Sequence, residues 1–135
     1  MESLKILFVC SGNAYRSPLA EALLKKLRPD LEVDSAGLHV AIPVSREVKD
    51  YLKKLDAEQH LKSYSESLDE KNLRDYDFIV AMEPRHKTAV LRKCPECQSR
   101  IAVWNIDDPY FEKQEDAEII YHEIENKVKE LAESM

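Results

Sequence analysis

Short apolar runs alternate with helical patterns along the whole chain, and this alternation constrains the fold more than any other feature. Four runs predict buried strands at residues 5–9, 32–35, 78–82 and 101–104, with helix-forming segments between them. Strands that alternate with helices form βαβ units, whose strands are parallel. The sequence therefore predicts an α/β fold: a single doubly wound domain over residues 1–135, with a four-stranded parallel sheet in the order 2-1-3-4 and helices on both faces.

Helices are predicted between and after these strands. Apolar residues spaced three and four apart mark amphipathic helices, and Pro84 fits the first turn of one of them. The predicted segments are 18–27, 48–55, 70–74 and 84–93, followed by a long C-terminal helix whose apolar face carries Ala117, Tyr121, Ile124, Val128 and Leu131.

Composition excludes several classes of protein. The formal net charge of −6 argues against a nucleic-acid-binding protein, which would show a basic face, and gives no attraction to anionic membranes. No apolar run approaches the length of a membrane span, and the first residues lack the pattern of a signal peptide. Three cysteines are unlike a secreted disulfide framework. We therefore expect a cytoplasmic protein without nucleic-acid or membrane partners, as a monomer or a weak dimer.

Residues 10–17 read Cys-Ser-Gly-Asn-Ala-Tyr-Arg-Ser and join the first predicted strand to the first predicted helix. Five residues between Cys10 and Arg16 are enough for the backbone to curl around one tetrahedral oxyanion, with the positive end of the helix behind it. Arg16 can bind two phosphate oxygens with its planar guanidinium. A helix N-terminus and a nearby cation favour the thiolate form of a cysteine. The sequence thus predicts Cys10 to be a nucleophile beneath a bound phosphate.

The other residues of this loop have predicted supporting roles. Gly12 permits backbone conformations that other residues resist, and Asn13 tolerates a left-handed conformation. Ser17 is a candidate N-cap, and its hydroxyl could also hydrogen-bond the thiolate. The remaining members of the predicted phosphate-binding loop are Ser11, Ala14 and Tyr15.

Four segments resemble the low-molecular-weight protein tyrosine phosphatases, whose fold also includes the thioredoxin-coupled arsenate reductases. Besides the loop, they are Val33–Gly37, Asp77–Met82 and Asp107–Tyr110, in the family's order and over most of the chain. The resemblance implies a cysteine-dependent phosphatase that hydrolyses phosphotyrosine in proteins through a phosphocysteine intermediate. It implies a phosphotyrosine-containing protein or an aryl phosphate as substrate, and no metal or other cofactor.

The resemblance also implies roles for the segment after the fourth strand. Asp108 lies directly before Pro109, as the family's acid does, and would protonate the leaving oxygen and then activate water. Asp107 is its local rival. Tyr110 and Phe111 resemble the aromatic pair that walls the family's pocket, although we expect at least one of them to pack into the core.

Ser35 is a further supporting residue that the resemblance implies, because the family's residue at this position hydrogen-bonds the residue at the position of Asn13 and fixes the loop. Three loop positions depart from the family's usual residues. Tyr15 stands where cysteine is frequent, so no disulfide within the loop can form, and Tyr15 either walls the pocket or points outward. Ser11 and Ala14 stand where larger apolar side chains are frequent, which leaves the substrate preference open.

Cys94 and Cys97 are the residues that a rival function would use. Their spacing is that of half a zinc site, but no second pair exists; they could instead form a disulfide or a redox pair. Arsenate reductases of this fold carry relay cysteines in the same part of the chain. The helical pattern at 84–93 offers no mobile segment for a relay, so we favour a phosphatase over a reductase or a noncatalytic phosphotyrosine-binding module. The four histidines match no catalytic role and are expected to be exposed or partly buried: His39, His60, His86 and His122.

Overall fold

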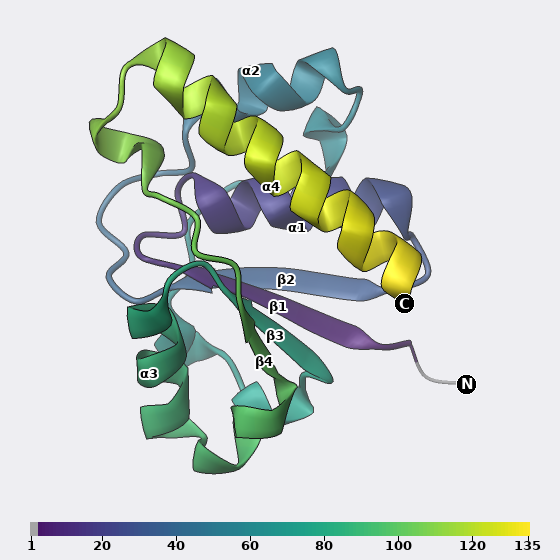
Figure 1. Cartoon of the computed structure of the whole chain (residues 1–135), viewed down its shortest axis with the longest axis vertical. Coiled ribbons are helices and arrows are strands. Elements are labelled where there is room, and N and C mark those ends of the chain that lie inside the picture. The colour runs from purple at the N-terminus through teal and green to yellow at the C-terminus, as the bar shows by residue number, and fades with distance from the viewer. Residues whose placement is uncertain (1–2) are drawn as a thin grey trace.

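A parallel four-stranded sheet runs through the centre of the molecule, in the order β2-β1-β3-β4 (Figure 1). The computed structural model describes residues 3–135, with β1 at Lys5–Cys10, β2 at Glu32–Gly37, β3 at Phe78–Ala81 and β4 at Ile101–Val103. All three strand pairs are parallel, which confirms the predicted sheet. Because ligands of such sheets bind beyond the carboxyl ends of the strands, the last residue of β1 lies at the functional edge.

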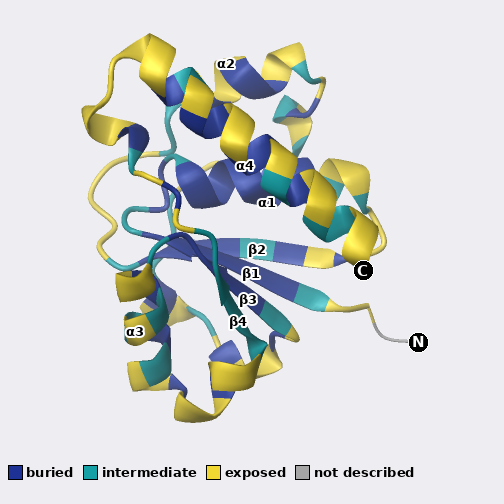
Figure 2. Ribbon diagram, viewed as in Figure 1, coloured by how far each residue is buried: buried dark blue, intermediate teal, exposed yellow. Residues whose placement is uncertain are grey.

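Helices cover both faces of the sheet. Figure 1 shows α1 (Arg16–Leu27), α2 (Arg46–Lys54) and α4 (Gln114–Ser134) on one side and α3 (Pro84–Lys93) on the other. The middle strands are therefore buried on both faces (Figure 2). The continuous apolar run Ile6–Val9, which is fully buried, is typical of a strand covered in this way.

The sheet separates two apolar cores, because alternate residues of a strand point to opposite faces. Ile6, Phe8 and Cys10 belong to the core with residues of α1 and α4. Leu7 and Val9 belong to the other core, which also contains Cys94 and Cys97. Cys10 and the two later cysteines thus pack into cores on opposite faces of the sheet.

Several boundaries differ from the predictions. The predicted helix at 70–74 is wrong: two separate 3-10 turns form at Leu68–Glu70 and Leu73–Asp75, because so short a segment does not offset the cost of nucleating an α-helix. The second strand extends to Gly37, and α1 begins at Arg16. Within residues 3–135, no helix is both long enough and apolar enough to span a bilayer.

Candidate active site

The loop after β1 carries Cys10 into a cavity at the carboxyl end of the sheet. The loop covers residues 11–15 and ends where α1 begins at Arg16. The cavity has a volume of about 250 Å³. Its wall comes from this loop and from the segments after β2 and β4: Cys10, Ser11, Gly12, Ala14, Tyr15, Arg16, His39, Ala41, Ile42, Asp108, Tyr110 and Phe111. The fold thus brings Cys10, Arg16 and Asp108 together in one cavity.

The backbone of the loop uses its carbonyl groups within the protein and leaves its N–H groups unpaired. The carbonyl oxygens at 10, 11 and 14 accept from the N–H groups at 38, 39 and 45, and the one at 13 accepts from the Ser65 hydroxyl. Within residues 3–135, no backbone N–H from 11 to 15 donates to another group of the chain. Because backbone donors require partners, successive unpaired N–H groups beside a cavity favour an oxyanion there.

A chain of hydrogen bonds runs from Glu21 to the sulfur of Cys10. Asn13 Nδ2 donates to Ser17 Oγ at 2.8 Å and to Ser35 Oγ at 2.9 Å, and Ser35 Oγ donates to Glu21 Oε1 at 2.6 Å. Ser17 Oγ lies 2.8 Å from Cys10 Sγ. Ser17 accepts from Asn13 and keeps its own hydroxyl proton free, so it can donate to the sulfur. The hydroxyl is therefore placed where it would donate to a thiolate at Cys10.

Lys62 fixes the orientation of the Asn13 amide from behind the loop. Its Nζ donates to Asn13 Oδ1 at 2.9 Å, and the backbone N–H of Glu66 donates to the same oxygen at 2.8 Å. With its oxygen held by two donors, the amide must turn its nitrogen toward Ser17 and Ser35. Asn13 has the left-handed φ of 54° that the sequence predicted, so the same contacts hold the backbone of the loop.

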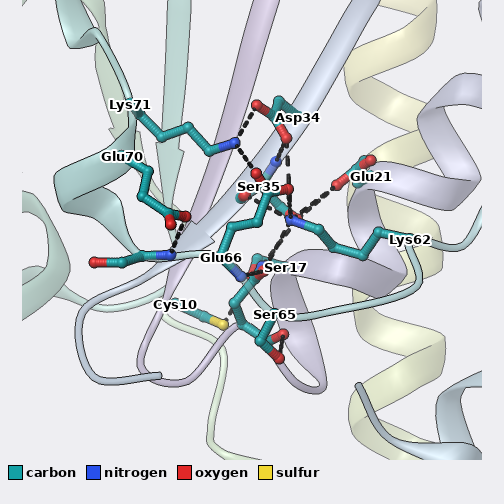
Figure 3. A network of polar contacts seen from close by, with 12 residues as sticks. Cys10, Ser17, Glu21, Asp34, Ser35, Lys62, Ser65, Glu66, Glu70 and Lys71 are labelled. Carbon is teal, nitrogen blue, oxygen red and sulfur yellow. Dashed lines mark hydrogen bonds and ion pairs between the residues drawn. The ribbon is translucent and has the colours of Figure 1, made fainter. Parts of the chain in front are cut away.

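Acidic side chains surround Lys62 and balance its charge (Figure 3). The Lys62 side chain is only 8% exposed, and its amine lies 2.8 Å from Glu66 and 3.9 Å from Glu21. Lys71 pairs with Glu66 at 2.8 Å and with Asp34 at 2.6 Å. Burial acts to raise the pKa of Asp34 and Glu66, but hydrogen bonds from the lysines outweigh it and lower both. Asp34 and Glu66 therefore stay ionised, and their ion pairs with the lysines support the loop from the protein side.

Gly37, at the end of β2, allows the loop to lie directly against the sheet. A Cβ atom at Gly37 would be 2.6 Å from the backbone nitrogen of Asn13 and 2.7 Å from the carbonyl carbon of Gly12. Gly12 itself has no positive φ, and the nearest atom to a Cβ there would be the His39 carbonyl oxygen at 3.7 Å. The prediction that Gly12 supplies special backbone freedom is therefore wrong, and the steric requirement for glycine lies at Gly37.

Arg16 is buried at the wall of the cavity and held by groups that follow two other strands. Its Nη1 donates to Glu83 Oε2 at 2.6 Å and to the Ile106 carbonyl oxygen at 2.7 Å. Its Nη2 lies 3.6 Å from Asp108 Oδ2. Burial acts to raise the pKa of Glu83, but hydrogen bonds from Arg16 and Arg85 lower it. Glu83 therefore stays ionised and fixes the guanidinium in place.

His86 is fully buried and lies behind Ser11. The prediction that all four histidines are exposed or partly buried is therefore wrong for His86. Its Nδ1 accepts from the backbone N–H of Glu83 at 3.0 Å, so the proton of the neutral ring is on Nε2, 3.0 Å from Ser11 Oγ. Burial, together with the charges of Arg16 and Arg85, lowers the pKa of His86 to about 4. At neutral pH the ring therefore donates a hydrogen bond to Ser11.

Aromatic side chains form one side of the cavity beside Asp108. Asp108 accepts from the backbone N–H of Tyr110 at 3.0 Å and caps the turn Pro109–Phe111. The Tyr110 ring meets Tyr15 edge-on at 6.1 Å and Phe111 at 4.8 Å between centroids. Tyr110 is 51% exposed and Phe111 84%, so the expectation that one of them packs into the core is wrong. Tyr15 was predicted either to wall the pocket or to point outward, and in the structure it lines the cavity.

The structure also tests where three further residues of the predicted site lie: Ser17, Asn13 and Asp107. Ser17 is the second residue of α1 rather than its N-cap, which is Tyr15 without a side-chain cap, because the Ser17 hydroxyl is turned to Cys10. Asn13 and Ser17 are fully buried and hold the loop rather than lining the cavity. Asp107 is exposed and lies outside the cavity wall.

Cys94 and Cys97 form a disulfide, one of the alternatives left open by their spacing. Both are fully buried against Leu73, Val90 and other residues of the core beneath α3. Neither contributes to the wall of the cavity that holds Cys10.

Sequence reasoning missed several residues of the site. Glu83 and His86 directly follow the third strand, so the rule that parallel strands end at the functional edge could have identified them. The wall residues His39 and Ile42 follow the second strand in the same way. Lys62 offers no comparable signal, because it lies in an ordinary polar stretch far from any strand end.

The fold and this cavity together define the class of cysteine-dependent phosphatases, because the strand-to-helix loop presents a thiol and unpaired N–H groups to one oxyanion. The family described as "Low molecular weight phosphotyrosine protein phosphatase" matches residues 5–135, and the chain belongs to this family.

Similar proteins agree with this assignment. The low molecular weight protein-tyrosine-phosphatase Wzb of Salmonella typhi is 34% identical over 97% of this chain and 93% of its own length. Vibrio vulnificus Wzb in complex with benzylphosphonate has a TM-score of 0.88 at 28% identity, covering 98% of this chain and 99% of its own. The YwlE arginine phosphatase from Geobacillus stearothermophilus has a TM-score of 0.85 at 30% identity, covering 97% and 92%.

Proposed function

We propose that this chain hydrolyses phosphotyrosine in proteins through a phosphocysteine intermediate on Cys10. The observation that carries the proposal is the placement of the Cys10 sulfur 2.8 Å from Ser17 Oγ, in a cavity bordered by unpaired backbone N–H groups. A thiolate is the nucleophilic form of cysteine, and both features favour negative charge at this position.

The residues of the cavity supply each part of the reaction. The Cys10 thiolate attacks phosphorus, and the P–S bond forms as the bond from phosphorus to the tyrosyl oxygen breaks. Asp108 gives its proton to that oxygen. Water then attacks the phosphocysteine while Asp108 accepts a proton, and the P–S bond breaks to release inorganic phosphate and the thiolate. Arg16 and the loop N–H groups stabilise the charge on the equatorial oxygens. None of these steps requires a metal or other cofactor.

The shape of the cavity favours an aryl phosphate over a phosphorylated guanidinium. Tyr15, Tyr110 and Phe111 offer aromatic surface beside the phosphate position, and a relative of this chain has been solved with benzylphosphonate. A guanidinium group would require a carboxylate partner, and the one carboxylate of the wall is Asp108, already 3.6 Å from Arg16.

The arrangement of the cysteines disfavours the arsenate reductase alternative. A relay would need Cys94 or Cys97 to reach Cys10, whereas these residues are buried in the core on the other face of the sheet. A noncatalytic binding module is also disfavoured, because it would not need Asp108 beside Arg16 at the cavity.

The remaining properties belong to the same proposal. The charge of −6 supports a protein that does not bind nucleic acid. We further propose that the enzyme acts in the cytoplasm, where the Cys10 thiol stays reduced and burial shields the Cys94–Cys97 disulfide from reductants. It would act as a monomer or a weak dimer on phosphorylated proteins.

Three variants test the mechanism in turnover assays with a phosphotyrosine peptide as substrate. Asp107→Ala is the control for Asp108→Ala. Cys10→Ser should abolish turnover while retaining vanadate binding. Asp108→Ala should lower kcat by about 10²–10⁴-fold, most strongly for poor leaving groups, and Asp107→Ala should change it little. Turnover retained in Cys10→Ser would refute the role of Cys10. Parallel assays with phosphoarginine peptide and with arsenate plus thioredoxin measure the competing activities, and a higher kcat/KM for either would overturn the proposal.

A further inference from the structure

A second cavity, here called the α2 cavity, lies between α2 and the segment 58–63. It has a volume of about 500 Å³ and shares no wall residue with the active-site cavity. Val44, Ser45 and residues of α2 form one part of its wall, and residues from Glu58 to Ser63 form the other. No aromatic side chain lines it. A cavity of this size can hold a ligand, and its polar wall selects for charge rather than for aromatic stacking.

Unpaired cations gather on the face of α2 that borders this cavity. Arg46, Lys49 and Lys53 all line it, and their spacing of three and four residues places them on one face of the helix. Within residues 3–135, no carboxylate lies within 4.0 Å of these three cations, and their side chains make no hydrogen bonds. The acidic residues Glu47 and Asp50 of the same helix line a different hollow.

The wall of the α2 cavity therefore carries an excess of positive charge. Its one carboxylate belongs to Glu58, against the three unpaired cations. Lys62 also contributes to the wall, but Glu66 neutralises its charge at 2.8 Å. Clustering like charges on one helix face is unfavourable in the absence of a partner. In a chain with a net charge of −6, this cluster is a local positive surface that attracts an acidic ligand.

The walls of the α2 cavity and the active-site cavity come close together at residues 42–44. Ile42 lines the active-site cavity and Val44 lines the α2 cavity, so the two walls are separated by about 7 Å of backbone at most. Ser45, at the start of α2, donates its N–H to the carbonyl oxygen of Ala14 in the phosphate-binding loop at 2.8 Å. An extended peptide advances about 3.3 Å per residue and a helix about 1.5 Å, so residues about two to six positions from a phosphotyrosine span the stretch from Arg46 to Lys53.

We propose that the α2 cavity binds acidic side chains that flank the phosphotyrosine of the substrate protein. The proposal rests on the proposed function, because the phosphotyrosine anchors the peptide in the active-site cavity. The short distance between the two walls, from Ile42 to Val44, favours a peptide attached to the phosphotyrosine over a separate anion. The cavity thereby makes the enzyme selective among phosphotyrosine sites, with Arg46, Lys49 and Lys53 as the selecting residues.

The test compares two phosphotyrosine peptides that differ only in having Asp and Glu or Asn and Gln at the flanking positions. Wild-type kcat/KM should be about five- to tenfold higher for the acidic peptide at low salt, as expected for a few exposed ion pairs, and the difference should shrink at high salt. Lys53→Glu should abolish or reverse the preference. Lys54→Glu is the control, because the neighbouring residue carries the same charge but lines the other hollow, where it lies 3.5 Å from Glu118, and it should retain the preference.

A small aryl phosphate separates this proposal from the proposed function. If wild type turns over the aryl phosphate and the neutral peptide but shows no preference for the acidic peptide, the α2 cavity is not a substrate site. Equal loss of preference in Lys53→Glu and Lys54→Glu would also overturn the proposal, because general charge repulsion would then explain it. Binding of tripolyphosphate without any preference between the peptides would show that the cavity takes a free anion instead. Absence of turnover on every phosphate ester would refute the proposed function itself.

Discussion

Mild acid should destabilise the protein through the buried ring of His86. Burial and the neighbouring arginines lower its pKa to about 4 from an ordinary value of 6.5. Between about pH 6.5 and pH 4, His86 is therefore protonated in the unfolded chain but neutral in the folded protein. The stability that the neutral ring contributes is fully present above pH 6.5 and is lost as the pH falls toward 4. At 1.36 kcal/mol per unit, the whole shift corresponds to about 3 kcal/mol, of which about 2 kcal/mol is lost between pH 7 and pH 5.

Urea unfolding of wild type and His86→Asn at pH 7 and pH 5 measures this contribution. Asn retains an acceptor for the backbone N–H of Glu83 but has no proton to gain in this range. We expect the free energy of unfolding of wild type to fall by about 2 kcal/mol more than that of His86→Asn between the two pH values. His39→Asn, which replaces an exposed histidine, is the matched control and should behave as wild type.

The comparison isolates His86 because other groups act mainly at lower pH. Asp34, Glu66 and Glu83 have lowered pKa values, so the stability that they contribute is lost only as the pH falls below the ordinary value for carboxyl groups. An equal loss of stability in wild type and His86→Asn would refute the reasoning, and a His86 ring that titrates near 6.5 by NMR would do the same.

Three further predictions concern the loop, the aromatic wall and the disulfide. Gly37→Ala should destabilise the protein by about 1–3 kcal/mol in urea unfolding and impair turnover, because the added Cβ would overlap the loop backbone. Gly12→Ala should have a smaller effect, and an equal loss of stability in the two variants would contradict the steric argument. Phe111→Ala should raise KM for phosphotyrosine peptide several-fold with little change in kcat, and an unchanged KM would remove the ring from substrate binding. Cys94→Ser/Cys97→Ser should lower the free energy of unfolding by about 1–3 kcal/mol but leave turnover of an aryl phosphate within about twofold; a large loss of turnover would connect the disulfide to the site.

The arrangement of the sheet was predictable from local patterns. The buried run Ile6–Val9 and the helix that opens at Pro84 depend on apolar periodicity and on the chemistry of proline, both of which act over a few residues. The position of Cys10 and Arg16 at one edge then follows from the parallel topology. For these features, short segments of sequence contain the whole physical cause.

The supports of the loop could not be predicted in the same way. Lys62 holds Asn13 from 49 residues away, and Gly37 meets the loop because β2 pairs with β1. The burial of His86 depends on how the start of α3 packs against the phosphate-binding loop at Ser11. Such contacts arise from tertiary packing, which periodicity and local propensity do not describe. The exposure of Phe111 follows from the turn that Asp108 caps, which turns the ring outward.

The contacts of Asn13 have a consequence for the order of folding events. They join the loop to partners 22, 49 and 53 residues away in sequence. Closing such long stretches of chain is slow, because the entropy of loop closure is lost before the long-range hydrogen bonds can form. The ability to capture an oxyanion should therefore appear only in the last stage of folding, so a compact but unfinished intermediate would have secondary structure and still fail to retain vanadate.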